Sequence, residues 1–243
     1  MRKKVFIIHL RRAKERLQQV DKITKFFPAG ECSVISAVDA RDLTDASLKR
    51  HYSPGYLRPH YPFALNNGEI ACFLSHRACW QRIVNENLDA GLIVEDDLEI
   101  DVNTFSGAYG LALNHFRNDL YVRFPVKRRE TSKYEIASNG QSKLFVPEIV
   151  GLKTTAQLVG VEAARRLLAA TESFDRPVDS FLQMSWVHGV NIYCVSPAGV
   201  SENDFKLGGS SIQRKLSLSS KFKREVQRFL YRLKIKQFSR KEK

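Results

Sequence analysis

The stretch Leu92-Ile93-Val94-Glu95-Asp96-Asp97 decides the fold and contains the strongest chemical signal of the chain. An apolar run that passes directly into three acids is typical of a buried strand that ends at the edge of a sheet. Side chains alternate along a strand, so Glu95 and Asp97 are predicted to share one side and Asp96 to point to the other. In α/β proteins ligands bind at such edges, and paired carboxylates can hold a hard divalent cation. A solvated strand end is the alternative interpretation.

Strand-like and helical segments alternate on both sides of this stretch. Strands are predicted at 5–9, 33–38, 92–94, 120–124, 144–150, 155–159 and 190–195, and helices at 13–27, 68–88, 104–115, 161–170 and 178–187. Asn66 and Glu69 have the spacing of a capping box at the start of the second helix. Prolines and glycines exclude regular helix from 51–67, and a polar, basic loop is expected at 127–143. The alternation predicts an α/β sandwich with a mainly parallel sheet.

Length and composition narrow the class of protein. The chain has 243 residues, of which 43% are hydrophobic, so it is long enough for one α/β domain and too apolar for a disordered chain. Its 13 glycines and 8 prolines exclude a collagen-like chain. The four cysteines form no C-x-x-C pair, which favours reduced, buried thiols. No segment approaches the ~20 apolar residues of a membrane span, so a soluble or peripheral, cytoplasmic protein is expected.

The basic residues are concentrated at the C-terminal end. The formal net charge is +13, but residues 213–243 hold 12 Lys and Arg against two Glu, a net charge of +10, which leaves +3 on residues 1–212. We therefore divide the chain into a domain of residues 1–212 and a tail of residues 213–243. The tail has the pattern of a basic amphipathic helix. Its predicted apolar stripe is Leu218, Phe222, Val226, Phe229, Leu230 and Leu233.

Two roles are open for this helix. Its apolar stripe could dock on the body, or the helix could bind an anionic membrane leaflet, where each basic residue near the surface contributes ~1 kcal/mol. The density of positive charge favours the membrane. Under that interpretation, deletion of residues 213–243 is expected to release the protein from anionic vesicles and to leave its chemistry on a soluble substrate intact.

Familiar short motifs are absent from the sequence. It contains no G-x-x-x-x-G-K-[ST], G-x-G-x-x-G, G-x-S-x-G or H-E-x-x-H, which excludes P-loop and dinucleotide fingerprints and weakens hydrolase and zinc-protease interpretations. A basic nucleic-acid-binding protein is a rival hypothesis. It leaves the acids at 95–97 unexplained, and no groove-reading motif accompanies the basic helix. We therefore expect no nucleic-acid partner.

Five elements, taken together and in order, resemble glycosyltransferase family 25 over residues 4–212. They are the opening Val5 to Arg16, the turn Ala37-Val38-Asp39-Ala40, the stretch Asn67 to His76, the acids Glu95-Asp96-Asp97-Leu98 and the segment Pro177-Val178-Asp179-Ser180-Phe181-Leu182. The resemblance implies a GT-A-like (Rossmann-like) nucleotide-sugar transferase fold. It also implies a lipooligosaccharide or lipopolysaccharide glycosyltransferase that usually transfers galactose.

The resemblance also implies roles for individual residues on the side of a UDP-sugar donor. Mn²⁺ or Mg²⁺ held by Asp97, with Glu95 or Asp96, would neutralise the diphosphate as it leaves. His188, before the last strand, is a further candidate metal ligand. The first strand up to His9 and the turn at Asp39 would cradle uracil and ribose. Arg11, Arg16, Ser75 and His76 are candidate contacts to the nucleotide or its phosphates. The alternatives are a surface cation for Arg16 and a packing role for His76.

Asp179 is the candidate general base of an inverting, single-displacement transfer, because such a reaction needs a group that accepts the proton of the acceptor hydroxyl. A carboxylate that merely stabilises the N-terminus of its helix is the alternative. Three positions depart from the family pattern: Gln157 replaces an aromatic residue, His9 an asparagine and Leu98 a valine. These departures leave the donor sugar open.

The sequence thus predicts an inverting hexosyltransferase that moves galactose from UDP-galactose to a lipid-linked oligosaccharide at the cytoplasmic face of the inner membrane. UDP-glucose and UDP-N-acetylhexosamine are alternative donors. An inactive scaffold with the same fold is a second alternative.

Overall fold

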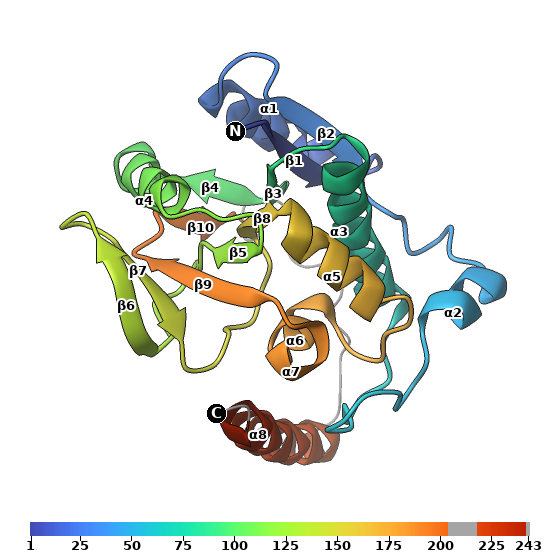
Figure 1. The fold of residues 1–243 in the computed structure, drawn as a ribbon. Coiled ribbons are helices and arrows are strands. Elements are labelled where there is room, and N and C mark those ends of the chain that lie inside the picture. Colours follow the sequence, from blue (N-terminus) through green and yellow to red (C-terminus); the bar gives the residue numbers. More distant parts are fainter. Residues whose placement is uncertain (204–217, 242–243) are drawn as a thin grey trace.

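A computed structural model describes residues 1–203 and 218–241 and contains a central sheet flanked by helices (Figure 1). The eight strands of this sheet follow the order β2-β1-β3-β8-β5-β9-β7-β6, and a second sheet pairs β10 with β4. The strands are β1 (Lys3–His9), β2 (Cys32–Ser36), β3 (Ala90–Glu95), β4 (Leu98–Ile100), β5 (Leu120–Arg123), β6 (Ser132–Ser138), β7 (Lys143–Pro147), β8 (Ala156–Gly160), β9 (Asn191–Ser196) and β10 (Val200–Glu202). The helices are η1 (Lys14–Arg16), α1 (Leu17–Phe26), α2 (Asp45–His51), α3 (Asn67–Asn85), α4 (Val102–Asn114), α5 (Val161–Ala170), α6 (Val178–Leu182), α7 (Ser185–His188) and α8 (Leu218–Lys241).

The large sheet is mixed but mostly parallel. Six of its eight strands run in one direction, and β8 and β7 run in the other. The antiparallel strand β8 lies between β3 and β5, so it begins at the edge where β3 ends. The predicted α/β class and the mostly parallel sheet are therefore confirmed.

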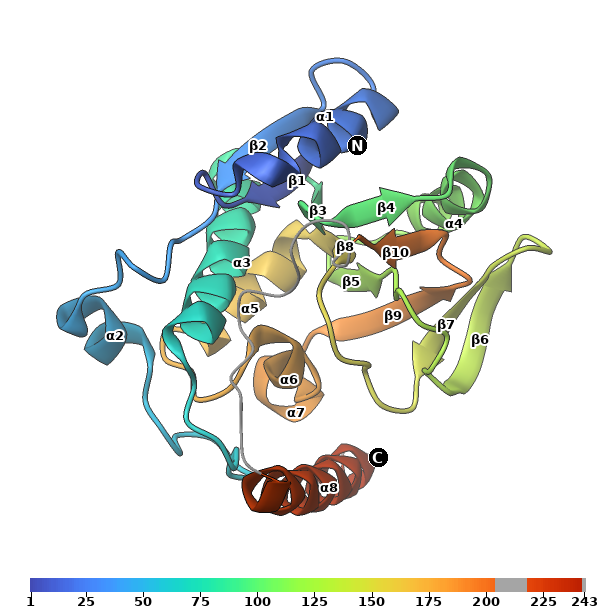
Figure 2. The same ribbon diagram turned by 180° about the vertical axis from the view of Figure 1, so that it is seen from behind.

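The apolar side chains of the strands pack into two hydrophobic cores, one on each face of the sheet. In β1, Val5 and Ile7 enter the core that includes residues of α1 and α4, while Phe6 and Ile8 enter the core that includes residues of α3, α5 and α6. This alternation follows from the two-residue period of a strand. Figure 2 shows the helices on the two faces from behind. The result is a three-layer α/β/α sandwich.

Two predictions about elements are wrong. The segment predicted as one helix at 178–187 forms α6 and α7, because Met184 leaves the helical conformation (φ −102°, ψ 63°) and is fully buried. The basic loop predicted at 127–143 contains β6, which pairs with β7. The residues of β6 are exposed or half-buried, so they lack the apolar alternation by which a strand is recognised.

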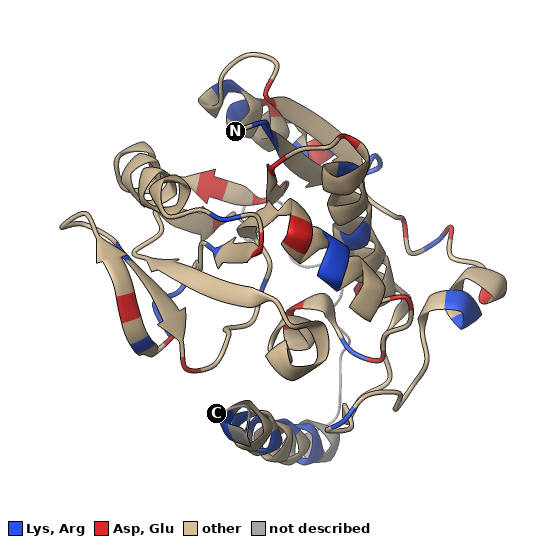
Figure 3. Cartoon of the chain, in the orientation of Figure 1, with Lys and Arg blue, Asp and Glu red and all other residues tan. Residues whose placement is uncertain are grey.

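Helix α8 covers most of the predicted tail, but it docks with a different face from the predicted one. Val226, Phe229, Leu230 and Leu233 of the predicted stripe are 42–59% exposed, and the side chains of Leu218 and Phe222 lie outside the described residues. Tyr231 and Ile235 are buried instead and pack with Met184. Lys and Arg residues follow one another along this helix (Figure 3). None of the described helices is long and apolar enough to cross a membrane.

Candidate active site

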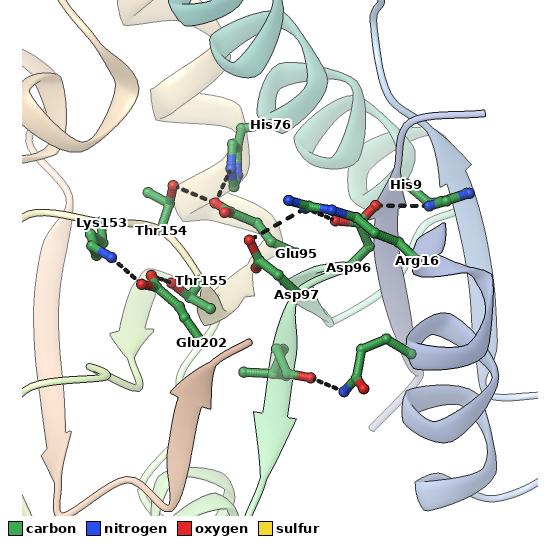
Figure 4. A network of polar contacts seen from close by, with 12 residues as sticks. His9, Arg16, His76, Glu95, Asp96, Asp97, Lys153, Thr154, Thr155 and Glu202 are labelled. Carbon is green, nitrogen blue, oxygen red and sulfur yellow. Dashed lines mark hydrogen bonds and ion pairs between the residues drawn. The ribbon is translucent and has the colours of Figure 1, made fainter. Parts of the chain in front are cut away.

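Glu95 is the last residue of β3, and Asp96 and Asp97 form the turn into β4 (Figure 4). Asp96 is bound by Arg16, whose Nη1 lies 2.5 Å from Oδ1, and by His9, whose Nδ1 lies 2.8 Å from Oδ2. Glu95 instead accepts a hydrogen bond of 2.8 Å from the hydroxyl of Thr154 and faces His76. The predicted alternation of the three acids is therefore wrong beyond Glu95: the strand ends there, and Asp96 and Asp97 in the turn share Arg16 as a partner.

Arg16 and His9 stabilise the buried charge of Asp96. Asp96 is only 5% exposed, and a carboxylate at such a position needs charged or polar partners. Nη1 of Arg16 also lies 3.4 Å from Oδ2 of Asp97, so this arginine belongs to the acidic turn and is no isolated surface cation. Within the part of the chain that the structure describes, the buried Nε2 of His9 has no hydrogen-bond partner. The ring is 5% exposed, so His9 is held inside the fold and binds Asp96 through its other nitrogen.

His76 is held between Gln157 and Glu95. The amide Nε2 of Gln157 lies 3.3 Å from Nδ1 of His76, and Nε2 of His76 lies 3.3 Å from Oε1 of Glu95. An amide N–H can only donate, so Nδ1 accepts and the ring proton is assigned to Nε2, directed at Glu95. Burial raises the pKa of Glu95, but the contacts with His76 and Thr154 outweigh it and hold the pKa below its ordinary value. Gln157, which replaces the aromatic residue of the family pattern, therefore orients His76.

Gly91 explains why α3 approaches β3 closely enough to bring His76 to Glu95. A Cβ atom at this position would lie 2.7 Å from Cγ1 of Ile83, which is closer than side chains tolerate. A glycine in a strand commonly marks such a close approach.

A short segment before β8 connects the acidic turn with Asp179. The backbone N–H of Lys153 donates to Oδ2 of Asp179 at 3.0 Å, and the hydroxyl of Thr154 donates to Glu95. The hydroxyl of Thr155 donates to Glu202 of β10 at 2.8 Å, and Nζ of Lys153 pairs with the same carboxylate. Segment 153–155 thus joins three carboxylates at one edge of the sheet.

Four residues of this edge were not predicted from the sequence, namely Lys153, Thr154, Thr155 and Glu202. Thr154 precedes the strand predicted at 155–159 and Thr155 begins it, and the first residues of a strand in a parallel sheet lie far from its neighbours' carboxyl ends. Because β8 is antiparallel to β3, its beginning lies beside the end of β3 instead. A predicted strand direction for β8 would have been needed to find these residues.

Asp179 lies in the first turn of α6 and is oriented by backbone donors. Besides the contact with Lys153, its Oδ1 accepts a hydrogen bond of 2.6 Å from the backbone N–H of Ser180. Both interpretations of this residue remain compatible with the geometry, since the carboxylate stabilises the helix start and also belongs to the edge that contains Glu95.

Ser75 is a structural residue in place of the predicted phosphate contact. Its hydroxyl donates to the carbonyl of Ala71 at 2.8 Å and accepts from the backbone N–H of Val38 at 2.9 Å, and the side chain is 2% exposed. Both hydrogen-bonding functions of the hydroxyl are therefore used within the fold. The contact fastens α3 to the chain that follows β2.

Asp39 and Arg11, two predicted donor contacts, are half-buried and exposed, respectively. Asp39 accepts from the backbone N–H of Arg41 at 3.0 Å and from Nε of Arg12 at 2.7 Å. These bonds hold the pKa of Asp39 below its ordinary value, the backbone bond from Arg41 being the largest cause. Arg11 is exposed. Their contacts with a nucleotide stay predictions.

His188 is a packing residue, so its prediction as a metal ligand is wrong. Its Nε2 lies 3.2 Å from the carbonyl oxygen of Leu182, and its Nδ1 accepts from the backbone N–H of Val190 at 3.0 Å. Both ring nitrogens are therefore occupied by the backbone. Burial lowers the pKa of His188 to about 4, so the ring is neutral at physiological pH.

The acidic turn fits a hard divalent cation only in part. Arg16 and His9 already bind Asp96, so the carboxylate oxygens of Glu95 and Asp97 are the ligands that Mn²⁺ or Mg²⁺ would prefer. Among the described residues, one group of three potential ligands has its atoms within 4.8 Å of one another, namely Cys72, His76 and Glu95. Burial raises the pKa of the Cys72 thiol well above its ordinary value, which makes it a poor ligand.

Comparisons with known proteins agree with the family resemblance of the sequence. Residues 2–182 match the model of Glycosyltransferase family 25 (LPS biosynthesis protein). Procollagen galactosyltransferase 1 of Danio rerio is 34% identical over 197 residues, which cover 75% of this chain and 31% of that protein. A glycosyltransferase 25 family member of Drosophila melanogaster is 31% identical over 191 residues, with 74% and 30% covered.

One similar protein is named as inactive. The inactive glycosyltransferase 25 family member 3 of Mus musculus is 28% identical over 190 residues, which cover 73% of this chain and 31% of that protein. The chain thus spans about 30% of the length of the curated relatives that it matches.

Proposed function

The chain belongs to glycosyltransferase family 25, and from this premise we propose that it moves galactose from UDP-galactose to a lipid-linked oligosaccharide, with inversion at the sugar carbon. A glycosyltransferase needs a sugar donor and an acceptor. One observation carries the proposal: segment 153–155 joins Glu95 and Asp179 at a single sheet edge, beside Asp96 and its cationic partner Arg16. This arrangement combines sites for a diphosphate and for a base.

On the donor side, Arg16 and His9 are the residues that we assign to the nucleotide. The guanidinium of Arg16 lies beside two carboxylates and is 17% exposed, so it can also face a phosphate. His9 binds Asp96 beside this arginine, and we assign it to the part of the site that receives the base or ribose. Bound Mn²⁺ or Mg²⁺ would supply positive charge to the leaving diphosphate, and Glu95 and Asp97 are the residues that would hold it.

On the acceptor side, Asp179 is the proposed general base. The acceptor oxygen forms a bond to C1 of the donor sugar while the bond from C1 to the phosphate oxygen breaks and UDP leaves. Asp179 accepts the proton of the acceptor hydroxyl and then releases it to water. The backbone N–H groups of Lys153 and Ser180 fix the carboxylate for this transfer.

The acceptor class rests on two supports. The description of the family model names LPS biosynthesis, and the basic helix α8 suits an acceptor that is embedded in an anionic membrane. We accordingly propose a peripheral location at the cytoplasmic face of the inner membrane. Procollagen, which appears in the names of relatives, is the alternative acceptor.

The test is a screen for UDP release by the full chain. UDP-galactose, UDP-glucose and UDP-N-acetylglucosamine are each supplied with a lipooligosaccharide or with a collagen peptide, first with Mn²⁺ and then with EDTA. We expect the fastest release from UDP-galactose with the lipooligosaccharide and Mn²⁺. UDP release that persists in EDTA would contradict the proposed metal dependence. UDP release with the collagen peptide alone would contradict the proposed lipooligosaccharide acceptor.

Two variants assign the roles within the same assay. Asp97→Ala is expected to abolish metal-dependent turnover, and Asp179→Asn to lower kcat by roughly 10²-fold or more while donor binding remains. The matched control is Asp21→Asn, which changes an exposed carboxylate on α1. No donor consumption by the wild-type chain under any condition would instead support an inactive family member, as the name of the mouse relative suggests.

A further inference from the structure

We infer that α8 is a working part of the acceptor side of the site: Tyr231, acting through Arg176, positions the loop 57–63 and the start of α6, which carries Asp179. The inference rests on the proposed function in one respect, the role of Asp179 as base. It assigns a positioning role to α8, a helix in the segment that was predicted to be a tail outside the domain of residues 1–212.

Arg176 is the centre of the contact between α8 and the body. Its side chain is fully buried, and its Nη1 donates to the hydroxyl oxygen of Tyr231 at 2.8 Å. Its Nε donates to Oδ1 of Asp175 at 2.7 Å, while Nη2 donates to the carbonyl of Pro59 at 3.0 Å. One guanidinium therefore holds the tail helix, the loop 57–63 and its own segment in a single arrangement. Buried networks of this kind specify geometry only while every member is satisfied.

The loop 57–63 depends on the same group of residues. The backbone N–H of Leu57 donates to Oδ2 of Asp175 at 2.9 Å. The ring of Tyr61 packs edge-on against Tyr231, with ring centroids 5.2 Å apart, and Arg224 of α8 lies 4.7 Å from the ring centroid of Phe63. The loop 57–63 thus forms hydrogen bonds with Asp175 and Arg176 and aromatic and cation–π contacts with α8.

Asp179 lies close to this junction. It follows Arg176 by three residues, and its helix begins directly after Pro177. The pKa of Tyr61 is raised by burial and then by the charges of Glu69 and Asp179, and the charge of Asp179 acts on Tyr231 in the same direction. His9 and Arg16 belong to β1 and η1, and Figure 1 shows β1 and α8 at opposite ends of the view.

Loss of the Tyr231 hydroxyl would leave a buried N–H of Arg176 without its acceptor. The guanidinium then has to shift towards another acceptor, and the loop 57–63 and the start of α6 shift with it. A small displacement of a catalytic carboxylate is enough to slow transfer strongly. Under this inference, removal of residues 213–243 would also slow transfer to a soluble acceptor, in contrast to the expectation from the sequence.

The experiment compares the full-length wild type with Tyr231→Phe, and Tyr134→Phe serves as the matched control because Tyr134 is 51% exposed on β6. For Tyr231→Phe we expect kcat/KM for a short, water-soluble acceptor to fall roughly tenfold. The KM for the donor and the slow UDP release without acceptor should not change. Arg176→Lys, which keeps the charge opposite Asp175 and loses the planar fork, is expected to act in the same direction.

Amide hydrogen exchange tests the positioning role without activity. Exchange in Tyr231→Phe should accelerate within 56–63 and 177–182 and remain unchanged in β1 and α1. A wild type that releases no UDP refutes the proposed function and leaves this measurement decisive. Unchanged exchange in both segments would overturn the inference. So would an unchanged acceptor kcat/KM in an active enzyme, or an equal loss for donor and acceptor.

Discussion

Both ring nitrogens of His188 are bound to backbone groups, and burial lowers its pKa from the ordinary 6.5 to about 4. Between these two values the unfolded chain binds a proton at this residue that the folded chain does not. The contribution of His188 to the free energy of unfolding is therefore fully present above about pH 6.5, and it is lost as the pH decreases towards 4.

The corresponding prediction concerns the free energy of unfolding. From pH 7 to pH 5, His188 should lower it by about 2 kcal/mol, and His188→Gln should remove that part of the decrease. Urea denaturation of both proteins at several pH values measures the difference. The exposed His115, in the same substitution, is the control. Parallel pH profiles for wild type and His188→Gln would contradict the assignment.

At the scale of single residues, the sequence identified chemistry better than partners. Glu95, Asp96, Asp97, Arg16 and His76 were predicted as site residues, and the structure brings them to one sheet edge. Ser75 was predicted from the family resemblance and His188 from its chemical type, yet hydrogen bonds to the backbone occupy both side chains. Such occupation depends on which carbonyl or N–H comes within reach, and a linear pattern does not contain that information.

At the scale of elements, the start of α3 was predictable because its signal is local. The side chain of Asn66 accepts from the backbone N–H of Glu69 at 3.0 Å, and Oε2 of Glu69 accepts from that of Asn66 at 2.9 Å. All partners lie within four residues. The direction of β8 and the break at Met184 depend instead on contacts between distant segments, and β6 lacks a buried face.

The cap gives a prediction about stability. Asn66→Ala should lower the free energy of unfolding by about 1 kcal/mol, because it removes the acceptor of an orphan helix N–H. Asn67→Ala, at an exposed position one residue further on, should change it by less than about 0.5 kcal/mol. Thermal and urea unfolding compare the two variants, and equal losses would show that the capping box contributes nothing.

At the scale of the whole molecule, the basic residues and the acidic site lie in different parts of the chain. Residues 213–243 carry +10 of the net +13, whereas the site on the body is built around carboxylates. Helix α8 has two different faces: Tyr231 and Ile235 pack on the body, whereas the described residues of the predicted apolar stripe are exposed, namely Val226, Phe229, Leu230 and Leu233. An exposed apolar stripe with basic flanks is the pattern of a helix that lies in a membrane interface.

This arrangement predicts that the outer face of α8 binds anionic vesicles. Phe229→Ser and Leu233→Ser should each weaken binding to vesicles that contain phosphatidylglycerol by about tenfold, since each removes apolar surface that lipid would cover. Val102→Ser, which changes a valine 58% exposed on α4, should have no effect. Vesicle co-sedimentation measures the affinities, and higher salt should weaken them, because exposed charges are screened. If the affinity is unchanged by both substitutions but falls with salt, only the basic side chains contact the vesicle. If the affinity is also unchanged by salt, the proposed peripheral membrane location is contradicted.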